Sequence, residues 1–327
     1  MSRIIKLNSS VIGTGNAVGV KEYEGPIGKC FDYHDKDDYF AADTFEKAES
    51  ELMHISFNIA LKKCGLERKD IGAIFAGDLQ NQCVGSSYGL LGCNIPYFGL
   101  YGACSTSCEG ILLASVFTTH NIFERCVAIT SSHNCAAERQ YRNPIEYGGQ
   151  RAPTSQWTVT GGAAFIIGAE QGKIKISSGL AGEVIDKGIC DANNMGAAMA
   201  PAAADTLLRY FDESKTSPDD FDLILTGDLG YEGSSILKEL MGIEGYKLDN
   251  HNDCGKIIYS KERQDTHAGG SGCGCGASVL SAYILPKMQK GELNKILYIA
   301  TGAMMSPDSL KQGRSIPTIA HLVCFER

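Results

Sequence analysis

Short runs of apolar residues, each bounded by glycine or a polar turn, alternate along this chain with longer amphipathic stretches. A short continuous apolar run is typical of a strand that is buried on both faces of a sheet. Such runs occur at residues 72–77, 126–131, 163–168, 222–227 and 295–301. The pattern therefore predicts a series of buried strands separated by helices.

The amphipathic stretches supply the helices. In residues 43–64, Leu52 and Ile59 recur at helical spacing, and Asp43 followed by Glu46 predicts the start of the helix. Further helices are expected directly after Cys104, over residues 201–211, after Gly233 and over residues 275–289. Strands that alternate with helices predict an α/β architecture with largely parallel sheets.

Three short patterns occur twice, in the same order. They are a strand before Gly-Asp-Leu (74–79 and 223–229), a glycine-rich turn with cysteine before a helix (102–107 and 270–275), and a strand rich in small and apolar residues (127–131 and 298–302). One such pair is expected in any α/β protein, whereas three ordered pairs indicate an internal duplication. We therefore expect two halves, residues 1–172 and 173–327.

Composition excludes several classes of function. The 327 residues carry 38 Asp plus Glu against 30 Lys plus Arg, a net charge of −8, without a basic run interleaved with aromatics, so nucleic acid is not an expected partner. No apolar segment approaches the roughly 20 residues that span a bilayer, and the first residues lack a signal-peptide core, which predicts a soluble, unsecreted protein. The 13 cysteines lack zinc-site spacing, so we expect reduced, mostly buried thiols and neither metal nor cofactor.

Cys104 is the main chemical candidate. It lies in Gly102-Ala-Cys-Ser-Thr-Ser107, directly before an apolar helical run. The start of a helix presents unpaired N–H groups and the positive end of the helix dipole, which favour a thiolate and bind anions. Cys104 is thus a candidate nucleophile, a pocket-lining residue or an ordinary buried thiol, and we favour the pocket-lining role.

Two histidines are further candidates. His133 follows a predicted strand, at the edge where ligands of open α/β sheets collect, and His321 stands in the last predicted strand. Each is a possible ligand contact or substitute base, and a buried histidine with satisfied hydrogen bonds is the alternative.

Two arginines, Arg139 and Arg142, lie three residues apart and so share one face of a helical turn. Planar guanidinium groups suit bidentate binding of carboxylates. Surface ion pairs with Glu138 and Glu146 are the equally weighted alternative.

These features resemble the thiolase-like superfamily, which includes thiolases and ketoacyl-synthase III enzymes. The resemblance implies duplicated βαβαβαββ halves that form a layered αβαβα sandwich. It also implies a nucleophilic cysteine at the buried N-terminus of the first half's central helix, the position at which Cys104 falls.

The chain departs from the condensing enzymes at two positions. Those enzymes pair the cysteine with a histidine in Pro-His-Gln-Ala-Asn and with an asparagine in Gly-Asn-Thr. Here Asp228 stands near the histidine position, and Gly270 or Ser271 near that of the asparagine. Condensation develops negative charge on a thioester oxygen, which a carboxylate repels. We therefore expect a degenerate active site in which acylation of Cys104 stays open, whereas carbon–carbon bond formation has no evident machinery.

Over its whole length the chain also resembles the stage V sporulation protein AD family. The matching stretches include Ser131-Ser-His-Asn134, Met199-Ala-Pro-Ala-Ala-Ala-Asp205, Ala268-Gly-Gly-Ser-Gly-Cys273 and Ile316-Pro-Thr-Ile-Ala-His321. This resemblance implies binding of dipicolinic acid, alone or as its calcium chelate, for uptake into the developing spore. It also implies membrane-embedded partners of the same uptake apparatus, a peripheral place at the inner spore membrane, and a homodimer.

The expected ligand-binding residues are Cys104, His133, Arg139, Arg142, Asp228, Gly270, Ser271 and His321. Two other functions remain open from the sequence. One is a cysteine-dependent acyltransferase or thiolase-type enzyme that uses Cys104 with His321 or His133 as its base. The other is a structural subunit with an empty pocket.

Overall fold

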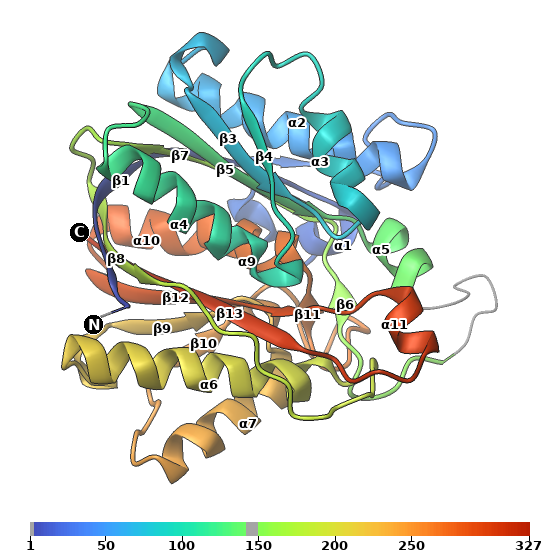
Figure 1. Cartoon of the computed structure of the whole chain (residues 1–327). Helices are drawn as coiled ribbons and strands as arrows, with labels where there is room; N and C mark the ends of the chain where they lie inside the picture. Colours follow the sequence, from blue (N-terminus) through green and yellow to red (C-terminus); the bar gives the residue numbers. More distant parts are fainter. Residues whose placement is uncertain (1–2, 142–149) are drawn as a thin grey trace.

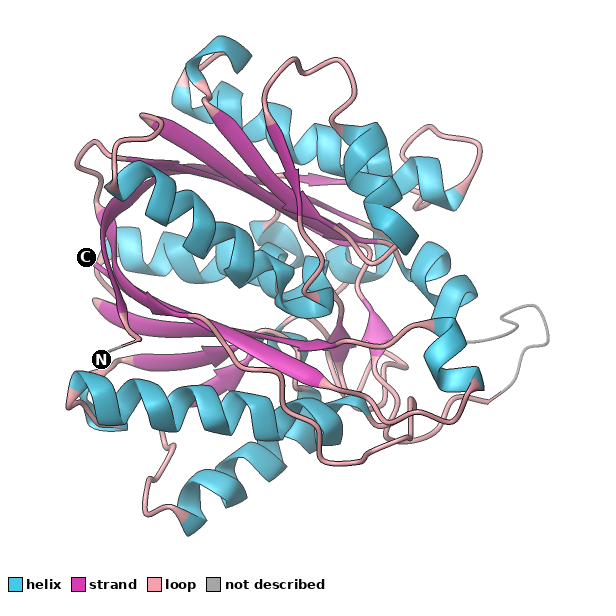
Figure 2. Cartoon of the chain, in the orientation of Figure 1, coloured by secondary structure: helices cyan, strands magenta, loops and turns pink. Residues whose placement is uncertain are grey.

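Two mixed sheets face each other across a layer of buried helices, and further helices cover the outer face of each sheet (Figures 1 and 2). The computed structural model describes residues 3–141 and 150–327. The outer layers contain α2 (Phe45–Cys64) with α3 (Val84–Gly89) on one side and α6 (Met195–Ser214) with α7 (Gly230–Ile243) on the other. The layered αβαβα arrangement expected from the resemblance is confirmed.

The two sheets have matching strand orders. In the first, the order is β4 (Tyr97–Gly99), β3 (Ala73–Gly77), β5 (Arg125–Ser132), β7 (Gly161–Gly168) and β1 (Ile5–Val18). In the second, it is β10 (His251–Asp253), β9 (Leu223–Thr226), β12 (Lys295–Ala303), β13 (Thr318–Glu326) and β8 (Ile174–Leu180). β1 and β8 are the inner edge strands of the two sheets, and they pair antiparallel. The two sheets are therefore joined into one continuous hydrogen-bonded sheet with β1 and β8 at its centre.

Only part of each sheet is parallel, which corrects the expectation of largely parallel sheets. The pairs β3–β4, β3–β5, β9–β10 and β9–β12 are parallel. The pairs β5–β7, β7–β1, β1–β8, β8–β13 and β13–β12 are antiparallel. The reason is that β7 returns beside β5, and β13 beside β12, in the opposite direction.

The predicted helices are present with shifted ends. Thr44, not Asp43, caps α2, because its side chain accepts the N–H of Lys47 at 3.3 Å. The helix expected over 201–211 extends over all of α6, and the one expected after Gly233 already begins at Gly230.

The central layer holds α4 (Thr106–Thr119) and a long interrupted helix. The latter consists of α9 (Cys273–Val279), a π-helical turn (Leu280–Ile284) and α10 (Leu285–Lys290). Pro286 has no N–H to donate, which accounts for the irregular turn just before it.

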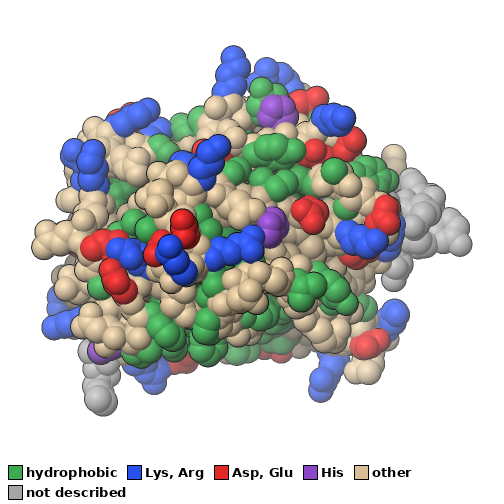
Figure 3. Space-filling view, turned by 90° about the horizontal axis from the view of Figure 1, so that it is seen from above, with side chains coloured by type: hydrophobic (Ala, Val, Ile, Leu, Met, Phe, Trp, Pro, Cys, Tyr) green, Lys and Arg blue, Asp and Glu red, His purple; other side chains and the backbone are tan. Residues whose placement is uncertain are grey.

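Two short pairs of strands complete the structure. β2 (Tyr33–His34) pairs with β1, and β6 (Trp157–Thr158) pairs with β11 (Gly270–Ser271) next to the start of α9. On the face that carries α2 and α3, basic and acidic side chains are interspersed instead of separated (Figure 3). All 13 cysteines are free thiols, and eight of them are buried.

Candidate functional site

Cys104 lies on a strained turn between the two sheets. The 3₁₀ turn Ala103–Ser105 leads directly into α4, and Ala103 has a φ of 49°, in the left-handed region that costs an alanine about 1–2 kcal/mol. Several hydrogen bonds hold this turn, among them those from the N–H of Gly102 to Thr106 at 3.0 Å and from the Ser105 hydroxyl to the Gly102 carbonyl at 2.6 Å. The turn presents the buried Cys104 side chain to the second half of the chain.

Asp228 faces Cys104 from just beyond the end of β9. Its carboxylate accepts hydrogen bonds from the Ser271 hydroxyl and the Gly272 N–H, both at 3.1 Å, and from the Thr301 hydroxyl at 2.8 Å. Gly272 has a φ of 102°, a conformation that lets its N–H reach this carboxylate and that suits glycine. The structure thus brings Cys104, Asp228 and Ser271 together.

The electrostatics of this group favour the neutral thiol. Burial is the main cause that raises the pKa of Cys104 well above its usual value. The negative charge of Asp228 and its hydrogen bond to the thiol raise this pKa further. Burial also raises the pKa of Asp228, against the hydrogen bonds that it accepts from Cys104 and Thr301. The prediction that the helix start favours a thiolate is therefore wrong for this site, because burial and Asp228 outweigh the helix dipole.

Two further buried residues hold this arrangement in place. The Gln156 amide donates to the carbonyls of Asp228 at 2.6 Å and Gly270 at 2.9 Å. Gly270 therefore contributes to this site through its backbone carbonyl. The carboxylate of Asp253 accepts the N–H groups of Leu229 at 2.8 Å and Gly230 at 2.9 Å. The sequence analysis assigned no role to either Gln156 or Asp253.

A narrow cavity, here called the inner pocket, opens beside Cys104. Its volume is about 40 Å³, and a water molecule takes up about 30 Å³ in the liquid. It is lined by Leu79, Tyr101, Ala103, Cys104, Ala137, Glu138, Tyr141, Thr158, Met195, Ser271, Ala303 and Met305. Without movement of its walls, this pocket is too small for an aromatic acid.

Two tyrosines border the inner pocket. The Tyr141 hydroxyl donates to the Leu79 carbonyl at 2.8 Å, and the Tyr101 hydroxyl lies 2.9 Å from that of Tyr141. Because the Tyr141 proton is used by Leu79, Tyr101 is the donor to Tyr141.

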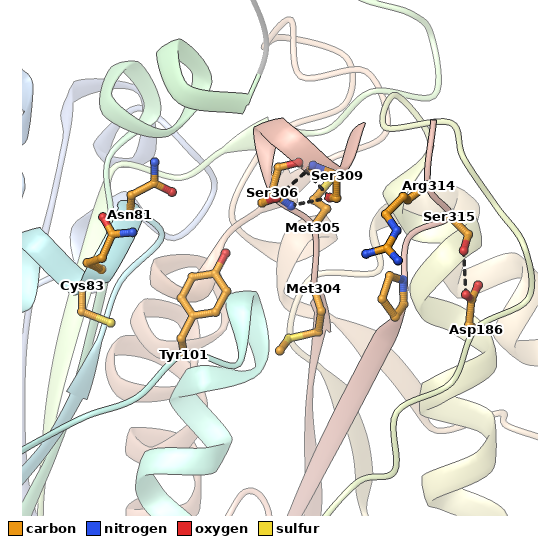
Figure 4. Close-up of a pocket in the computed structure, with 12 residues that line it drawn as sticks. Asn81, Cys83, Tyr101, Asp186, Met304, Met305, Ser306, Ser309, Arg314 and Ser315 are labelled. Atoms are coloured by element: carbon orange, nitrogen blue, oxygen red, sulfur yellow. Dashed lines mark hydrogen bonds between the residues drawn. The ribbon is translucent and has the colours of Figure 1, made fainter. Parts of the chain in front are cut away.

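A second, larger cavity lies on the other side of Tyr101 and Met305, which line both. This outer cleft has a volume of about 600 Å³, within the range of small-molecule sites. It is formed by Asn81, Gln82, Cys83, Tyr101, Asp186, Met304, Met305, Ser306, Ser309, Arg314, Ser315 and Pro317, most of them shown in Figure 4. No sequence motif pointed to the outer cleft.

The two predicted histidines do not line either cavity. His133 is buried, and its Nε2 lies 2.8 Å from the Asp38 carbonyl, while burial lowers its pKa. The His321 Nδ1 accepts the N–H of Gly182 at 3.1 Å, and burial lowers the pKa of His321 to about 4. His321 matches the alternative of a buried histidine with a hydrogen-bond partner. His133 matches it only at Nε2, because its buried Nδ1 has no hydrogen-bond partner among the described residues.

Arg139 also lies away from the inner pocket and the outer cleft. Its side chain is half exposed, pairs with Glu46 at 3.4 Å and lies over the ring of Phe45. Glu46 is thus a partner that the sequence did not indicate, and the expected partner Glu146 lies outside the described residues. Its neighbour Glu138 is buried, borders the inner pocket and accepts the Thr158 hydroxyl at 2.9 Å. Arg142 lies outside the described residues.

The comparison with known sequences identifies the family. A profile of the family described as Stage V sporulation protein AD (SpoVAD) matches residues 2–326. The chain belongs to this family. The stage V sporulation protein AD of Bacillus subtilis (strain 168) is 45% identical over 318 residues, which cover 97% of this chain and 94% of that protein. The family resemblance seen in the sequence is confirmed, and the chain is a sporulation protein with a thiolase-like fold.

Solved structures show the fold. OleA from Xanthomonas campestris superposes with a TM-score of 0.62 at 11% identity, over 97% of each chain. The 3-oxoacyl-[acyl-carrier-protein] synthase III of Aquifex aeolicus VF5 superposes with a TM-score of 0.59 at 11% identity, over 98% of this chain and 100% of that one. At such identity the likeness concerns the fold alone.

The described residues contain neither a membrane-spanning helix nor a metal-binding cluster. Over residues 3–141 and 150–327, none of the helices has the length and apolar character needed to cross a membrane. Within the same ranges, His, Cys, Asp and Glu side chains form no group of three or more that could hold a metal ion.

Proposed function

We propose that this chain binds dipicolinic acid, alone or as its calcium chelate, for uptake into the developing spore. Membership of the SpoVAD family supports a role in sporulation. The link to dipicolinic acid comes from the resemblance of the sequence to this family along its whole length. The outer cleft supports a binding role, since its volume suits a small aromatic acid.

The observation that carries the proposal is the contact of Cys104 with Asp228. A condensing enzyme needs a reactive cysteine and neutral hydrogen-bond donors for the charge that develops on the thioester oxygen. Here burial and Asp228 keep Cys104 protonated, and the Ser271 and Gly272 donors are already used by the Asp228 carboxylate. The site therefore has the shape of a condensing site without its chemistry, which favours binding over catalysis.

Calorimetry tests this proposal. Purified protein titrated with dipicolinate, with and without calcium, should release or absorb heat with a saturable, one-to-one profile. Pyridine, which has the same ring without carboxylates, is the matched control and should give only heat of dilution. Folded protein that gives no binding heat with millimolar dipicolinate contradicts the proposal.

A Cys-dependent acyltransferase is the competing function, favoured by the position of the Cys104 thiol on the wall of the inner pocket. Incubation with acyl-coenzyme A followed by intact-mass measurement separates the two. Under our proposal no stoichiometric adduct forms. An adduct that disappears in Cys104→Ala supports the enzyme instead.

We also propose that the chain acts as a homodimer at the inner spore membrane, together with membrane-embedded proteins of the uptake apparatus. The exposed edge strand β4 supports the dimer, because its free edge can pair with a second copy. Membrane fractions from sporulating cells should retain the protein, and should release it when the membrane-embedded partners are deleted.

A further inference from the structure

The outer cleft is built from segments of both halves of the chain. Residues 81–83 precede α3, Asp186 follows β8, and residues 304–317 connect β12 to β13. Figure 4 shows Asn81 and Cys83 on one side, Arg314 and Asp186 on the other, and Tyr101 between them. A ligand in this cleft contacts residues that are far apart in the sequence.

Arg314 supplies an unpaired positive charge to the outer cleft. Its side chain is exposed, and among the described residues no carboxylate lies within ion-pair distance of its guanidinium group, which extends into the cleft in Figure 4. Asp186 is the one carboxylate among the described residues that line the cleft. It already accepts hydrogen bonds from Ser315 at 2.6 Å and from the Gly188 N–H at 2.8 Å, which lower its pKa. Asp186 therefore stays ionised, but it is held by Ser315 and Gly188 and forms no ion pair with Arg314, whose guanidinium can still pair with a ligand.

The other walls of the cleft suit a flat apolar ring. Tyr101 offers an aromatic face and Met304 a polarizable thioether, two groups that pack well against aromatic ligands. Ser306 and Ser309 also line the cleft, although the Ser309 hydroxyl already donates to the Ser306 carbonyl. The combination of one free guanidinium with an apolar floor matches a planar aromatic carboxylate.

We propose that the outer cleft is the binding site for the aromatic dicarboxylate and that Arg314 pairs with one of its carboxylates. This inference rests on the proposed function, and it names Arg314 as the residue that makes the outer cleft specific for a carboxylate ligand. The ring lies against Tyr101 and Met304, at the mouth of the inner pocket. A guanidinium holds a carboxylate through two parallel N–H···O bonds, so it recognises this ligand by geometry as well as by charge.

Titration of two charge variants tests the role of Arg314. Arg314→Gln should weaken dipicolinate binding about tenfold or more, because a hydrogen-bonded charge pair is lost. Lys311→Gln removes one positive charge from the end of α11 (Pro307–Lys311), in the same connection but outside the lining of the cleft, and should stay within about twofold of the unchanged protein. Picolinate, which has one carboxylate, should also bind more weakly to Arg314→Gln. Equal dipicolinate affinity in Arg314→Gln and the unchanged protein overturns the proposal.

A second readout locates the ligand directly. Cys83 lines the outer cleft, whereas Cys30 is exposed away from it and serves as the internal reference. Saturating dipicolinate should slow alkylation of Cys83 by iodoacetamide, as measured on peptides by mass spectrometry, and leave Cys30 unchanged. Cys83 alkylation that is insensitive to bound dipicolinate overturns the proposal. Absence of any dipicolinate binding to the unchanged protein is a distinct result, which contradicts the proposed function itself.

Discussion

The hydroxyl oxygens of Tyr101 and Tyr141 lie 2.9 Å apart, and this hydrogen bond stands between the outer cleft and Cys104. Tyr141 comes from the end of α5 (Asn134–Tyr141), whereas Tyr101 precedes the strained turn at Ala103. Access to the inner pocket therefore depends on two side chains whose hydroxyl groups hold each other in place.

Tyr141→Phe should make Cys104 more accessible. The change removes the hydrogen bonds to Tyr101 and to the Leu79 carbonyl, each worth about 1 kcal/mol. We expect alkylation of Cys104 to accelerate about fivefold or more. Peptide mass spectrometry, with exposed Cys190 as the reference, measures the rate. Tyr88→Phe is the matched control on an exposed tyrosine, and equal Cys104 rates in both variants refute the prediction.

Asp228→Asn should lower the pKa of Cys104. The negative charge of Asp228 and its hydrogen bond both raise that pKa, so a neutral amide moves it downward. The pH profile of Cys104 alkylation should shift to lower pH, whereas Asp265→Asn on the surface leaves it in place. The introduced amide also faces the donors Ser271 and Gly272, so urea unfolding should show a loss of about 1–3 kcal/mol. An unchanged profile in a folded variant contradicts the electrostatic role of Asp228.

Glu22→Gln should change how stability depends on pH. Burial raises the pKa of Glu22 to about 7, and its carboxylate accepts the Tyr259 hydroxyl and the Thr160 N–H. A carboxyl with a raised folded-state pKa stabilises the fold fully below its unfolded pKa of about 4.5, and this contribution is lost as pH rises through 7. Glutamine mimics the protonated acid, so the variant should gain stability relative to the unchanged protein as pH rises from about 4.5 to 7.

The expected gain for Glu22→Gln is about 1–3 kcal/mol at pH 8, from urea unfolding at several pH values. Comparison with the unchanged protein cancels the opposite effect of His251 and His321, whose pKa values burial lowers. Glu24→Gln, on an exposed neighbour, should give a flat difference. A flat difference for Glu22→Gln as well would show that Glu22 does not titrate in this range.

Phe98→Lys should disrupt the proposed homodimer. β4 is the outermost strand of its sheet, and Tyr97 and Phe98 are 37% and 43% exposed on it. A lysine on an edge strand opposes pairing with a second chain. Light scattering after size exclusion should show a dimer for the unchanged protein and a monomer for the variant. Ile243→Lys, on an exposed apolar residue of α7, should remain dimeric. A monomeric unchanged protein contradicts the proposal directly.

The buried strands could be predicted from the sequence, whereas the strand at the centre could not. Residues 126–131 and 295–301 are continuous apolar runs because both faces of β5 and β12 are covered. β1 is just as central, but it contains Gly15, where a Cβ would lie 2.4 Å from the backbone of Ala60 in α2. Close packing of α2 against β1 therefore requires glycine where a strand pattern shows an apolar side chain. The break between the halves at residue 172 remains a prediction.

The candidate site, like the fold, could be predicted only in part from the sequence. The resemblance to the condensing enzymes predicted that Asp228 and Ser271 lie close to Cys104, and the structure shows that they do. The protonation of Cys104 was not predicted, since it depends on burial that the local sequence does not reveal. Arg314 could not be predicted either, because the outer cleft exists only once loops from both halves meet. The ligand-binding roles of Cys104, Asp228 and Ser271 remain predictions.

The antiparallel ladder between β1 and β8 limits how this molecule can admit a ligand. Along that edge, main-chain hydrogen bonds run from Ile5 opposite Gly179 to Val11 opposite Ile174. Moving the halves apart as rigid bodies would break the hydrogen bonds between β1 and β8. The binding free energy of a small acid does not compensate for that loss. Entry and release must therefore proceed through local rearrangement of loops and side chains at the cleft, while the scaffold behind them stays still.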